Sequence, residues 1–252
     1  MADDIVLRTE ALSKKFGSLE VTRDVTIELP RGARHALIGP NGAGKTTLIN
    51  LITGQLTADT GRIVLGSEDV TRLPVAARVR RGLTRTFQIN TLFPDLTPIE
   101  SLTLAICERK KEAGQFWGAL PAHREAIDEA DQILHQLQLG EVATRQTRHL
   151  AYGQQRLLEI ALALATRPKV LLLDEPAAGV PKSESAALFE VIAALPTDIS
   201  VLFIEHDMNL VFTFATHIHV LVQGAVLLSG PPDKIAHDPQ VREVYLGSKH
   251  HG

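Results

Sequence analysis

The sequence predicts an α/β fold on a mainly parallel sheet, with an N-terminal antiparallel β subdomain and an inserted α-helical subdomain. Between Ile5 and Gly66, short alternating runs such as Val25–Leu29 are broken by turn residues such as Pro30–Gly32, which is typical of half-buried strands. From about Gln88 to Arg167 the pattern becomes helical. From Lys169 onward, continuous apolar runs alternate with helical segments, as in parallel strands covered on both faces.

We expect the first zone, from Ile5 to Gly66, to form an antiparallel sheet. In the helical zone, Thr97–Glu100 has the spacing of a capping box with Pro98 at the first helical position, so a helix should start there. The segment Pro121–Leu139 carries apolar residues at helical spacing, and Gly140 stands where a C-terminal cap belongs. We therefore predict an amphipathic helix that is capped by Gly140.

The size of the chain fits one domain with a large insertion. Its 252 residues, 44% hydrophobic and 22% charged, can bury one sizeable core. We expect residues 1–87 and 168–252 to form a catalytic α/β core, and residues 88–167 to form the helical subdomain. The sequence has no internal repeat and no low-complexity tract.

The composition excludes several classes of protein. The net charge of −3 offers no basic footprint, so nucleic acid is not an expected partner. The single cysteine, Cys107, rules out an intramolecular disulfide and a multi-cysteine metal site, and we interpret it as a core residue. The start Met1–Asp4 is acidic, unlike a secretory signal, and no apolar run approaches the ~18 residues of a spanning helix. We expect a cytosolic chain that does not cross a membrane.

The chemistry is concentrated in a glycine-rich run, Gly39–Thr47, which follows the apolar residues Ala36–Ile38 and precedes Leu48–Ile52. In the order strand, loop, helix, glycines let the backbone wrap a phosphate chain while successive amides point inward at a helix N-terminus. Lys45 would reach the β- and γ-phosphates and Thr46 would hold Mg²⁺. A glycine-rich turn that matches by chance is the alternative, and the flanking segments argue against it.

A second anchor is the run Lys169–Glu175, in which a buried strand delivers Asp174 to the carboxyl edge of the sheet. There Asp174 can bind Mg²⁺ or its waters, while Glu175 can polarise an attacking water as a general base. The alternative is an ordinary acid pair at a helix N-terminus. A further apolar strand, Val201–Ile204, leads to His206, and this position at a strand end favours contact with the γ-phosphate over a surface histidine.

With these residues in this order, the chain resembles the ATPase subunits of ATP-binding-cassette (ABC) transporters along nearly its whole length. Gly39–Thr47 resembles their Walker A motif and Val170–Glu175 their Walker B motif with its catalytic glutamate. Gln88 resembles the Q-loop glutamine, and His206 the switch histidine. The resemblance implies a P-loop NTPase core with ATP and Mg²⁺ as cofactors.

Phe16 resembles the aromatic residue on which that family stacks adenine, a contact worth ~1 to 3 kcal/mol by analogy with base stacking elsewhere. An ordinary core phenylalanine is the alternative. Motifs and resemblance together assign three sets of residues. The nucleotide set is Phe16, Gly39, Asn41, Gly42, Ala43, Gly44, Lys45, Thr46, Thr47, Gln88, Gly153 and Gln154; the metal set is Thr46, Gln88 and Asp174; the catalytic set is Lys45, Glu175 and His206.

Two motifs depart from the family pattern. Leu150–Arg156 stands where the family reads Leu-Ser-Gly-Gly-Gln, so the serine hydroxyl and one glycine are missing. Gly153 and the amides that open the following helix would still present a positive dipole end to the nucleotide of a partner cassette. Ala178–Pro181 stands where the family's D-loop ends in aspartate, so that link between two sites is not expected here.

These departures indicate a subfamily. Sequences of this kind resemble the ATPases of branched-chain amino acid importers, and importers of urea and related small solutes have ATPases of the same type. The segments that carry this resemblance are Thr86–Gln88, Leu150–Gly153, Asp174–Gly179, Glu205–Met208 and the tail Val244–Gly247. The resemblance implies two non-identical ATPases, two membrane permease subunits and a solute-binding protein. This chain resembles the first of the two ATPases, which retains a Q-loop glutamine, and is expected at the cytoplasmic face of the membrane.

The mechanism that the resemblance implies has two cassettes sandwiching two ATP molecules, with binding driving closure and hydrolysis permitting reopening. Gln88 and the helices after it would pass the change to the membrane subunits. Four apolar residues are candidates for the docking surface, with plain core packing as the alternative: Phe93, Leu96, Phe116 and Trp117.

Rival functions are less consistent with the residues. A soluble ABC ATPase acting on DNA or ribosomes usually has two cassettes or a long coiled-coil insertion, and this sequence has neither. A non-hydrolysing regulatory nucleotide-binding module is suggested only by Ala151 and Pro181, while the intact Lys45, Glu175 and His206 oppose it. A GTPase would need an Asn-Lys-x-Asp guanine reader, which is missing. The transported solute, the direction of transport and the choice between homo- and heterodimer are not encoded in these motifs.

Overall fold

The computed structural model describes residues 4–86, 92–110 and 124–246, which form two compact units. Unit 1 consists of Met1–Arg85, Lys169–Glu175 and Leu195–Gly252, and unit 2 of Thr86–Pro168 and Pro176–Ala194. The sequence-based boundaries placed Pro176–Ala194 with the core. The structure groups this segment with the helical unit because α6 (Lys182–Ala193) packs against α5 (Tyr152–Leu164).

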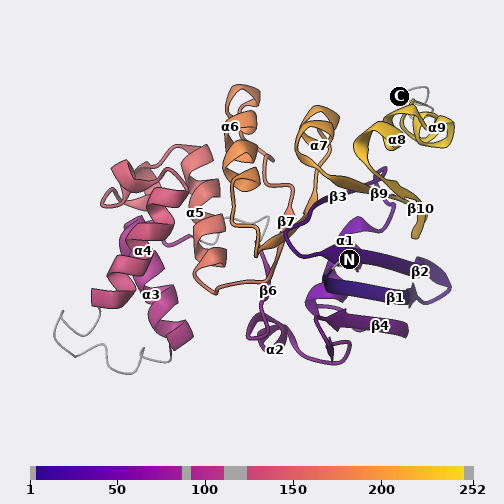
Figure 1. Ribbon diagram of the computed structural model, residues 1–252, viewed down its shortest axis with the longest axis horizontal. Coiled ribbons are helices and arrows are strands. Elements are labelled where there is room, and N and C mark those ends of the chain that lie inside the picture. Colours follow the sequence, from indigo (N-terminus) through magenta and orange to yellow (C-terminus); the bar gives the residue numbers. More distant parts are fainter. Residues whose placement is uncertain (1–3, 87–91, 111–123, 247–252) are drawn as a thin grey trace. The chain divides into compact units, whose positions relative to one another are not determined.

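Unit 1 contains two sheets (Figure 1). The antiparallel sheet has the strand order β2-β1-β4-β5. Its strands are β1 (Ile5–Phe16), β2 (Leu19–Pro30), β4 (Thr60–Leu65) and β5 (Glu68–Asp69). The second sheet has the order β10-β9-β3-β8-β7-β6, and all its neighbours pair in parallel except β10 with β9. Its strands are β3 (Arg34–Ile38), β6 (Leu83–Arg85), β7 (Val170–Asp174), β8 (Ser200–Ile204), β9 (His217–Val222) and β10 (Ala225–Gly230).

The sequence pattern explains which strand joins which sheet. In β2 the buried residues Val25, Ile27 and Leu29 alternate with exposed ones, as in a strand with one face in contact with solvent. Every residue of β3, β7 and β8 is buried, which explains the apolar runs Ala36–Ile38, Val170–Leu173 and Val201–Ile204 within them. The expectation of antiparallel pairing throughout Ile5–Gly66 is therefore wrong for β3, because both of its faces are buried and it pairs in parallel with β8 and β9.

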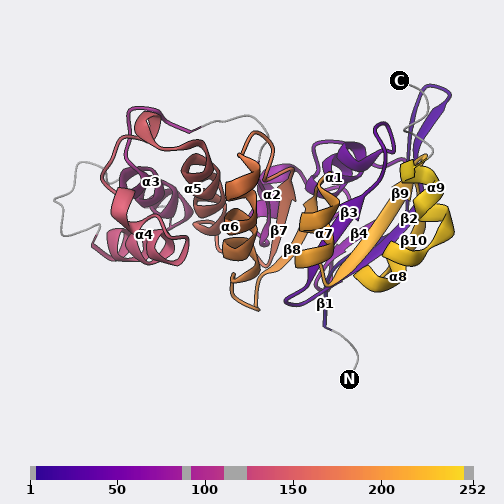
Figure 2. The ribbon, with the colours of Figure 1, turned by 90° about the horizontal axis from the view of Figure 1, so that it is seen from above.

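The helices of unit 1 are α1 (Lys45–Thr53), α2 (Val75–Val79), α7 (Met208–Phe214), α8 (Pro232–His237) and α9 (Pro239–Leu246). Helix α1 contributes Leu48, Ile49, Leu51 and Ile52 to a core that it shares with both sheets. Each such side chain stabilises the fold by about 1.5 to 3 kcal/mol through burial. Figure 2 shows α8 and α9 beside β9 and β10.

A buried arginine closes the far end of α1. The guanidinium of Arg78, only 1% exposed, donates to the carbonyl oxygens of Leu51 and Ile52 at 2.7 and 2.6 Å. These carbonyls lie at the negative dipole end of α1, where a cation is stabilising, and Leu51 O also accepts from the N–H of the C-cap residue Gly54 at 3.2 Å. Arg78 thus caps the C-terminal end of α1, opposite the end that meets the glycine-rich loop.

The described part of unit 2 consists of helices, and its first helix starts where the sequence predicts. The helices are α3 (Pro98–Lys110), α4 (Arg124–Gln136), the 3-10 helices η3 (Gly140–Val142) and η4 (Thr147–His149), α5 and α6. The capping box is confirmed, since the backbone N–H of Thr97 donates to Glu100 Oε2 at 2.8 Å and α3 begins at Pro98. Cys107 is buried in α3, as expected.

The end of α4 differs from the prediction. Gln138, with φ of 59°, takes the left-handed position that Gly140 was expected to occupy. The N–H of Leu139 then donates to Leu134 O at 2.8 Å, and both leucines are fully buried. The burial of Leu139 outweighs the cost of a left-handed non-glycine residue, and Gly140 instead opens η3.

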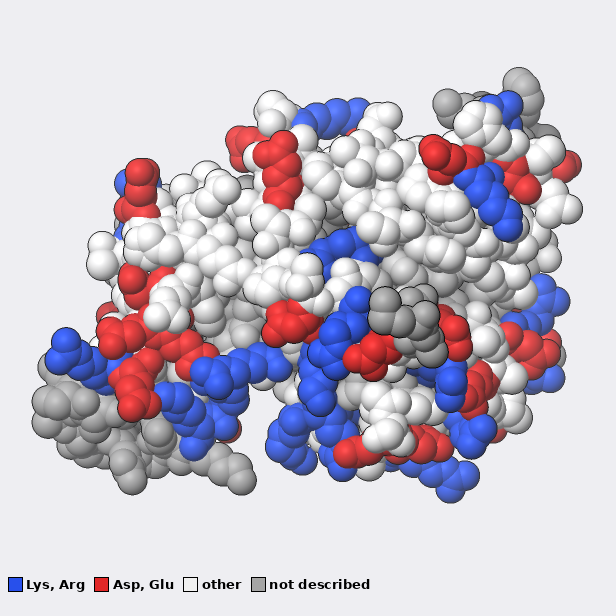
Figure 3. Space-filling model, viewed as in Figure 1, with Lys and Arg blue, Asp and Glu red and all other residues white. Residues whose placement is uncertain are grey.

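Charges of both signs are interspersed on the face seen in Figure 3, and several are paired. On the antiparallel sheet Glu10 accepts from both Arg8 and Arg62 at 2.7 Å. Within the described ranges, no helix has the length and apolar character needed to cross a bilayer.

Candidate nucleotide-binding site

The glycine-rich loop lies in unit 1 between the buried strand β3 and the start of α1, in the predicted order. Two of its glycines are required by close backbone approach. A Cβ on Gly39 would lie 2.1 Å from Leu221 O, and one on Gly44 would lie 2.6 Å from Val21 O. Gly44 also caps α1 with φ of 98°, a conformation that glycine adopts without steric cost. The loop backbone is therefore wedged between β2 and β9, which leaves its concave side for a ligand.

Lys45 is the first residue of α1 and folds back over the loop. Its Nζ donates to Gly39 O at 2.6 Å and to Pro40 O at 3.1 Å. Burial lowers the pKa of Lys45, and the charges of Glu175 and Asp174 oppose that shift. The ammonium is thus fixed at the mouth of the loop by oxygen acceptors.

Two acids stand at the end of β7, and they have different surroundings. Asp174 is 3% exposed and forms an ion pair with Arg85. Glu175 has a half-exposed position and a backbone φ of 49°, in the left-handed region that costs a non-glycine residue roughly 1–2 kcal/mol. Its N–H donates to Ile204 O at the end of β8 at 3.0 Å, which helps hold this conformation.

His206 follows β8 and meets Glu175 directly. Its Nε2 lies 2.8 Å from Glu175 Oε1, and 48% of the histidine side chain and 29% of the glutamate side chain are exposed. The pair therefore joins the ends of neighbouring strands β7 and β8 and remains accessible to a ligand. A carboxylate in this position can orient both an imidazole and a water molecule.

A cavity of about 250 Å³ opens over these groups. Most of the predicted residues of the loop and strand ends line it: Asn41, Gly42, Ala43, Gly44, Lys45, Thr46, Thr47, Glu175 and His206, together with Val21 and Ile204. The structure thus brings together residues from three separate segments that the sequence assigned to one site, and adds Val21 and Ile204. Gln88 lies outside the described residues.

Arg85 is a residue of this neighbourhood that the sequence analysis missed. It donates from Nη2 to Asp174 Oδ2 and from Nη1 to Asn50 Oδ1 at 2.6 Å. The sequence signal that could have revealed it is a charged residue at the end of a short strand, directly before the segment assigned to the Q-loop.

The donor set at the loop fits a hard divalent cation. Thr46 offers an exposed hydroxyl at the start of α1, and Asp174 offers a carboxylate at the end of β7. Oxygen ligands of this kind, completed by phosphate and water, are those that Mg²⁺ prefers. The residues present are therefore chemically suited to Mg²⁺.

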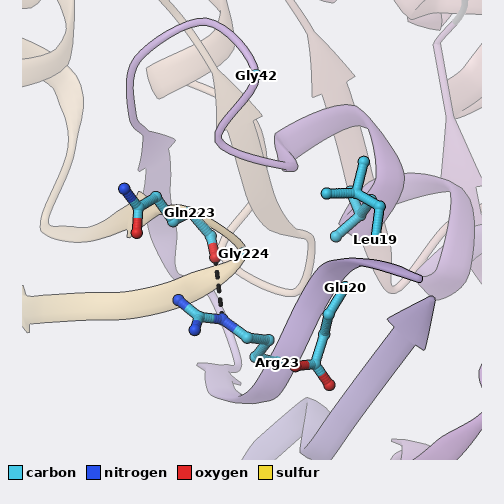
Figure 4. Close-up of a pocket in the computed structure, with 7 residues that line it drawn as sticks. Leu19, Glu20, Arg23, Gly42, Gln223 and Gly224 are labelled. Carbon is cyan, nitrogen blue, oxygen red and sulfur yellow. Dashed lines mark hydrogen bonds between the residues drawn. The ribbon is translucent and has the colours of Figure 1, made fainter. Parts of the chain in front are cut away.

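A second cavity, of about 380 Å³, adjoins the tip of the loop at Gly42 (Figure 4). It is lined by Leu19, Glu20, Val21, Arg23, Gly42, Gln223 and Gly224. Figure 4 shows the Arg23 Nε bond to Gln223 O, 3.1 Å long, which joins β2 to the turn between β9 and β10. Phe16, at the end of β1, is 47% exposed, so it is not the core residue that was the alternative to a stacking surface.

The N-terminus of α5 in unit 2 carries the unusual signature residues. Ala151 is the N-cap residue and supplies no side-chain acceptor, while the side chain of Gln154 accepts from the Ala151 N–H at 3.0 Å. The ring of Tyr152 lies where a Cβ on Gly179 would come within 2.9 Å. The two departures from the family pattern, in the signature and in the D-loop, are therefore in contact with each other.

Comparison with known proteins agrees with this site. A family model described as "ABC transporter" matches residues 22–178, more than half of the chain. The chain belongs to the ABC transporter family. A second model, described as a branched-chain amino acid ATP-binding cassette transporter, matches residues 225–251. As an ABC-transporter ATPase, the chain has the cassette fold and binds ATP or ADP.

The ABC cassette is similar to relatives along nearly its whole length. It is 42% identical over 250 residues to the high-affinity branched-chain amino acid transport ATP-binding protein LivG of Salmonella typhimurium, covering 96% of this chain and 98% of the relative. The corresponding BraF protein of Pseudomonas aeruginosa is 40% identical over 251 residues, with the same coverage. The crystal structure of the ADP conformation of MJ1267, an ATP-binding cassette of an ABC transporter, has a TM-score of 0.84 at 34% identity, covering 96% of this chain and 99% of that one.

Proposed function

We propose that this cassette binds and hydrolyses ATP to energise an importer of branched-chain amino acids or a related small solute. The observation that carries the proposal is the convergence of Lys45, Glu175 and His206 on one cavity beside the loop. The relatives named above, at 42% and 40% identity, support the choice of solute.

In the proposed mechanism, Lys45 exchanges its loop carbonyls for the β- and γ-phosphate oxygens of ATP. His206 approaches the γ-phosphate and holds the Glu175 carboxylate through their 2.8 Å contact. Glu175 then accepts a proton from the attacking water as a general base, for which typical rate factors are about 10² to 10⁴. The hydrogen bond between Glu175 and His206 supports this active role over a regulatory module that does not hydrolyse ATP.

We propose Mg²⁺ as the metal cofactor, held by Thr46 and Asp174. When bound, it would neutralise charge on the phosphates. Gln88, the third predicted metal residue, keeps its proposed role on the resemblance alone.

The proposed assembly is a dimer of cassettes, homo- or heterodimeric, in which Gly153 and Gln154 at the start of α5 face the nucleotide of the partner. The amides of Tyr152 and Gly153 open this helix and supply the positive end of its dipole. Without the serine hydroxyl of the usual signature, the backbone would make this contact.

The membrane permease subunits are the proposed partners of unit 2, at the cytoplasmic face of the membrane, and a solute-binding protein acts through them. An apolar groove of about 410 Å³ in unit 2 is lined by Leu96, Ile99, Glu100, Thr103, Leu104 and Ile127. Nearby in sequence, Phe93 is 62% exposed, which excludes plain core packing for this residue. Both features support a docking surface here, whereas Phe116 and Trp117 lie outside the described residues.

The proposal is tested by purifying the chain from detergent with the polypeptides that accompany it. We expect two permease subunits and a second cassette, and the reconstituted complex should take up leucine when ATP is supplied inside the vesicles. Lys45→Ala should assemble equally well but transport nothing, because it loses the phosphate contact. Purification without any membrane partner, or uptake by the Lys45→Ala complex, would contradict the proposal.

A further inference from the structure

The guanidinium of Arg85 joins the two elements that hold the proposed metal ligands. Arg85 ends β6, the edge strand, and pairs in register with Leu172 of β7. Its side chain therefore reaches forward to Asp174, two residues beyond Leu172, where Nη2 donates to Oδ2. The ion pair is buried, with 9% of the Arg85 side chain and 2% of the Asp174 side chain exposed.

The other side of the same guanidinium faces α1. Nη1 donates to Asn50 Oδ1 at 2.6 Å and to Gln55 Oε1 at 3.1 Å. Asn50 lies in α1, the helix that begins with Lys45 and Thr46, and Gln55 follows that helix closely. A rigid planar cation thus ties the helix carrying Thr46 to the strand carrying Asp174, a task suited to the fork geometry of arginine.

The ion pair also gives the two oxygens of the Asp174 carboxylate different surroundings. Arg85 engages Oδ2, while Oδ1 makes no hydrogen bond with the other described residues. Anchoring one oxygen by a buried cation restricts the orientation of the carboxylate and leaves the second oxygen as the one that could bind a metal. Partners of this kind, one bond behind a metal ligand, typically change metal affinity by about 10- to 100-fold.

We propose that Arg85 is a positioning residue for the metal-binding carboxylate of Asp174, and that it sets the affinity of the nucleotide-loaded site for its divalent cation. This inference rests on the proposed function of the site. Arg85 touches neither nucleotide nor metal in this role, since it acts through Asp174 and through the spacing between α1 and β7.

The test is direct metal binding by the full chain, with Mn²⁺ as the probe followed by electron paramagnetic resonance in the presence of ATP. A Glu175→Gln background prevents turnover. We expect Arg85→Met to weaken Mn²⁺ binding by about 10- to 100-fold, while ATP affinity in EDTA stays within about twofold. If ATP affinity falls equally in Mn²⁺ and in EDTA, or if neither affinity changes, the positioning role is wrong.

Arg34→Met is the matched control. Arg34 is a buried arginine of the same unit whose guanidinium donates to the carbonyls of Leu195 and Ile199, at the start of β3 and away from the loop. This control should lower the melting temperature and leave Mn²⁺ affinity unchanged. A loss of Mn²⁺ affinity in the control equal to that of Arg85→Met would overturn the assignment.

Two milder variants serve if Arg85→Met does not fold. Arg85→Lys keeps the charge but lacks the planar fork, and Asn50→Ala removes only the α1 contact. Each should weaken Mn²⁺ binding less than the loss of the whole guanidinium, and unchanged affinity in both would overturn the inference. Failure of the parent chain to bind Mn·ATP would instead count against the proposed function of the site.

Discussion

The chain has two proposed phosphate-binding places, one for its own nucleotide and one for the nucleotide of a partner cassette, and they are built in different ways. The carboxyl edge of the parallel sheet in unit 1 relies on side chains, with an ammonium, two carboxylates and an imidazole at defined distances. The N-terminus of α5 in unit 2 offers no charged or hydroxyl side chain at its N-cap, Ala151, and relies on backbone amides.

This difference between side-chain and backbone contacts explains which of the two places can depart from the family's residues. At the sheet edge each side chain has a partner, so replacing one leaves another buried or misdirected. At α5 the amides are supplied by any residue in helical conformation, and the unusual residues serve packing instead. Tyr152 lies against Gly179, and the Arg156 guanidinium carbon lies 5.2 Å from the centroid of the Tyr152 ring. The departures from the family pattern therefore lie in the region where the proposed contact with nucleotide uses backbone amides.

The largest effect is expected at the sheet edge, for Glu175→Gln. The amide cannot accept a proton from water, so phosphate release by the assembled transporter should fall by about 10² to 10⁴-fold while ATP binding persists. Glu190→Gln, an exposed acid on α6, is the control and should leave the rate unchanged. Near-normal turnover of Glu175→Gln would break the comparison, since the sheet edge would then not depend on this side chain.

A second expected effect separates the two units by the sign of their pH response. In unit 1, His35 Nδ1 lies 3.1 Å from His219 Nε2, and burial lowers the pKa of His35 to about 4 and that of His219 to about 3. Because the unfolded chain binds these protons near pH 6.5, stability is full above that pH and falls below it, by about 1.4 kcal/mol per pH unit for each histidine. In unit 2, burial raises the pKa of Glu159, so its contribution to stability grows as the pH falls through that pKa.

Hydrogen exchange measured at about pH 7 and about pH 5.5, after correction for intrinsic rates, checks the sign predicted for unit 1. Amides of β3 and β9 should lose protection at the lower pH, and a His219→Gln variant should lose less. Equal acid sensitivity of β9 in His219→Gln and the parent would rule out the histidine cluster as the cause.

The smallest expected effect is at α5, for Ala151→Ser. Gln154 already accepts from the N–H of residue 151, and a serine hydroxyl would accept from the N–H of Gln154 to complete the capping box. The free energy of unfolding should rise by about 0.5 to 2 kcal/mol, read as a higher melting temperature. The same substitution at Ala187, exposed within α6, should instead lower stability by up to about 0.7 kcal/mol. A destabilised Ala151→Ser would show that this helix start is not limited by its cap.

The sequence predicted those parts of the fold and site whose signals are local. The loop Gly39–Thr47, the strands that end at Asp174 and Ile204, and the start of α3 each depend on neighbouring residues, and the structure places them as expected. The roles of the site residues remain predictions until variants are measured.

What the sequence did not reveal depends on distant partners. Arg85 is held by distant partners, among them Asp174, which lies 89 residues further along the chain. The left-handed residue at the end of α4 is Gln138 because Leu139 and Leu134 bury each other, and no local preference for glycine reports that packing. The assignment of β3 to the second sheet follows from β8 and β9, its neighbours there.

The position of Lys45 has a consequence for ligand exchange. In the structure its ammonium is bound by Gly39 O and Pro40 O, so the loop contains its own internal competitor for the triphosphate. When a nucleotide binds, the ammonium of Lys45 exchanges the two loop carbonyl oxygens for phosphate oxygens. When the nucleotide leaves, the carbonyl oxygens accept from the ammonium again, so it is never without hydrogen-bond acceptors. The contribution of Lys45 to nucleotide affinity is therefore the difference in free energy between its phosphate-bound and carbonyl-bound states. This difference is smaller than it would be for an ammonium without other acceptors, which favours rapid turnover over tight retention of product.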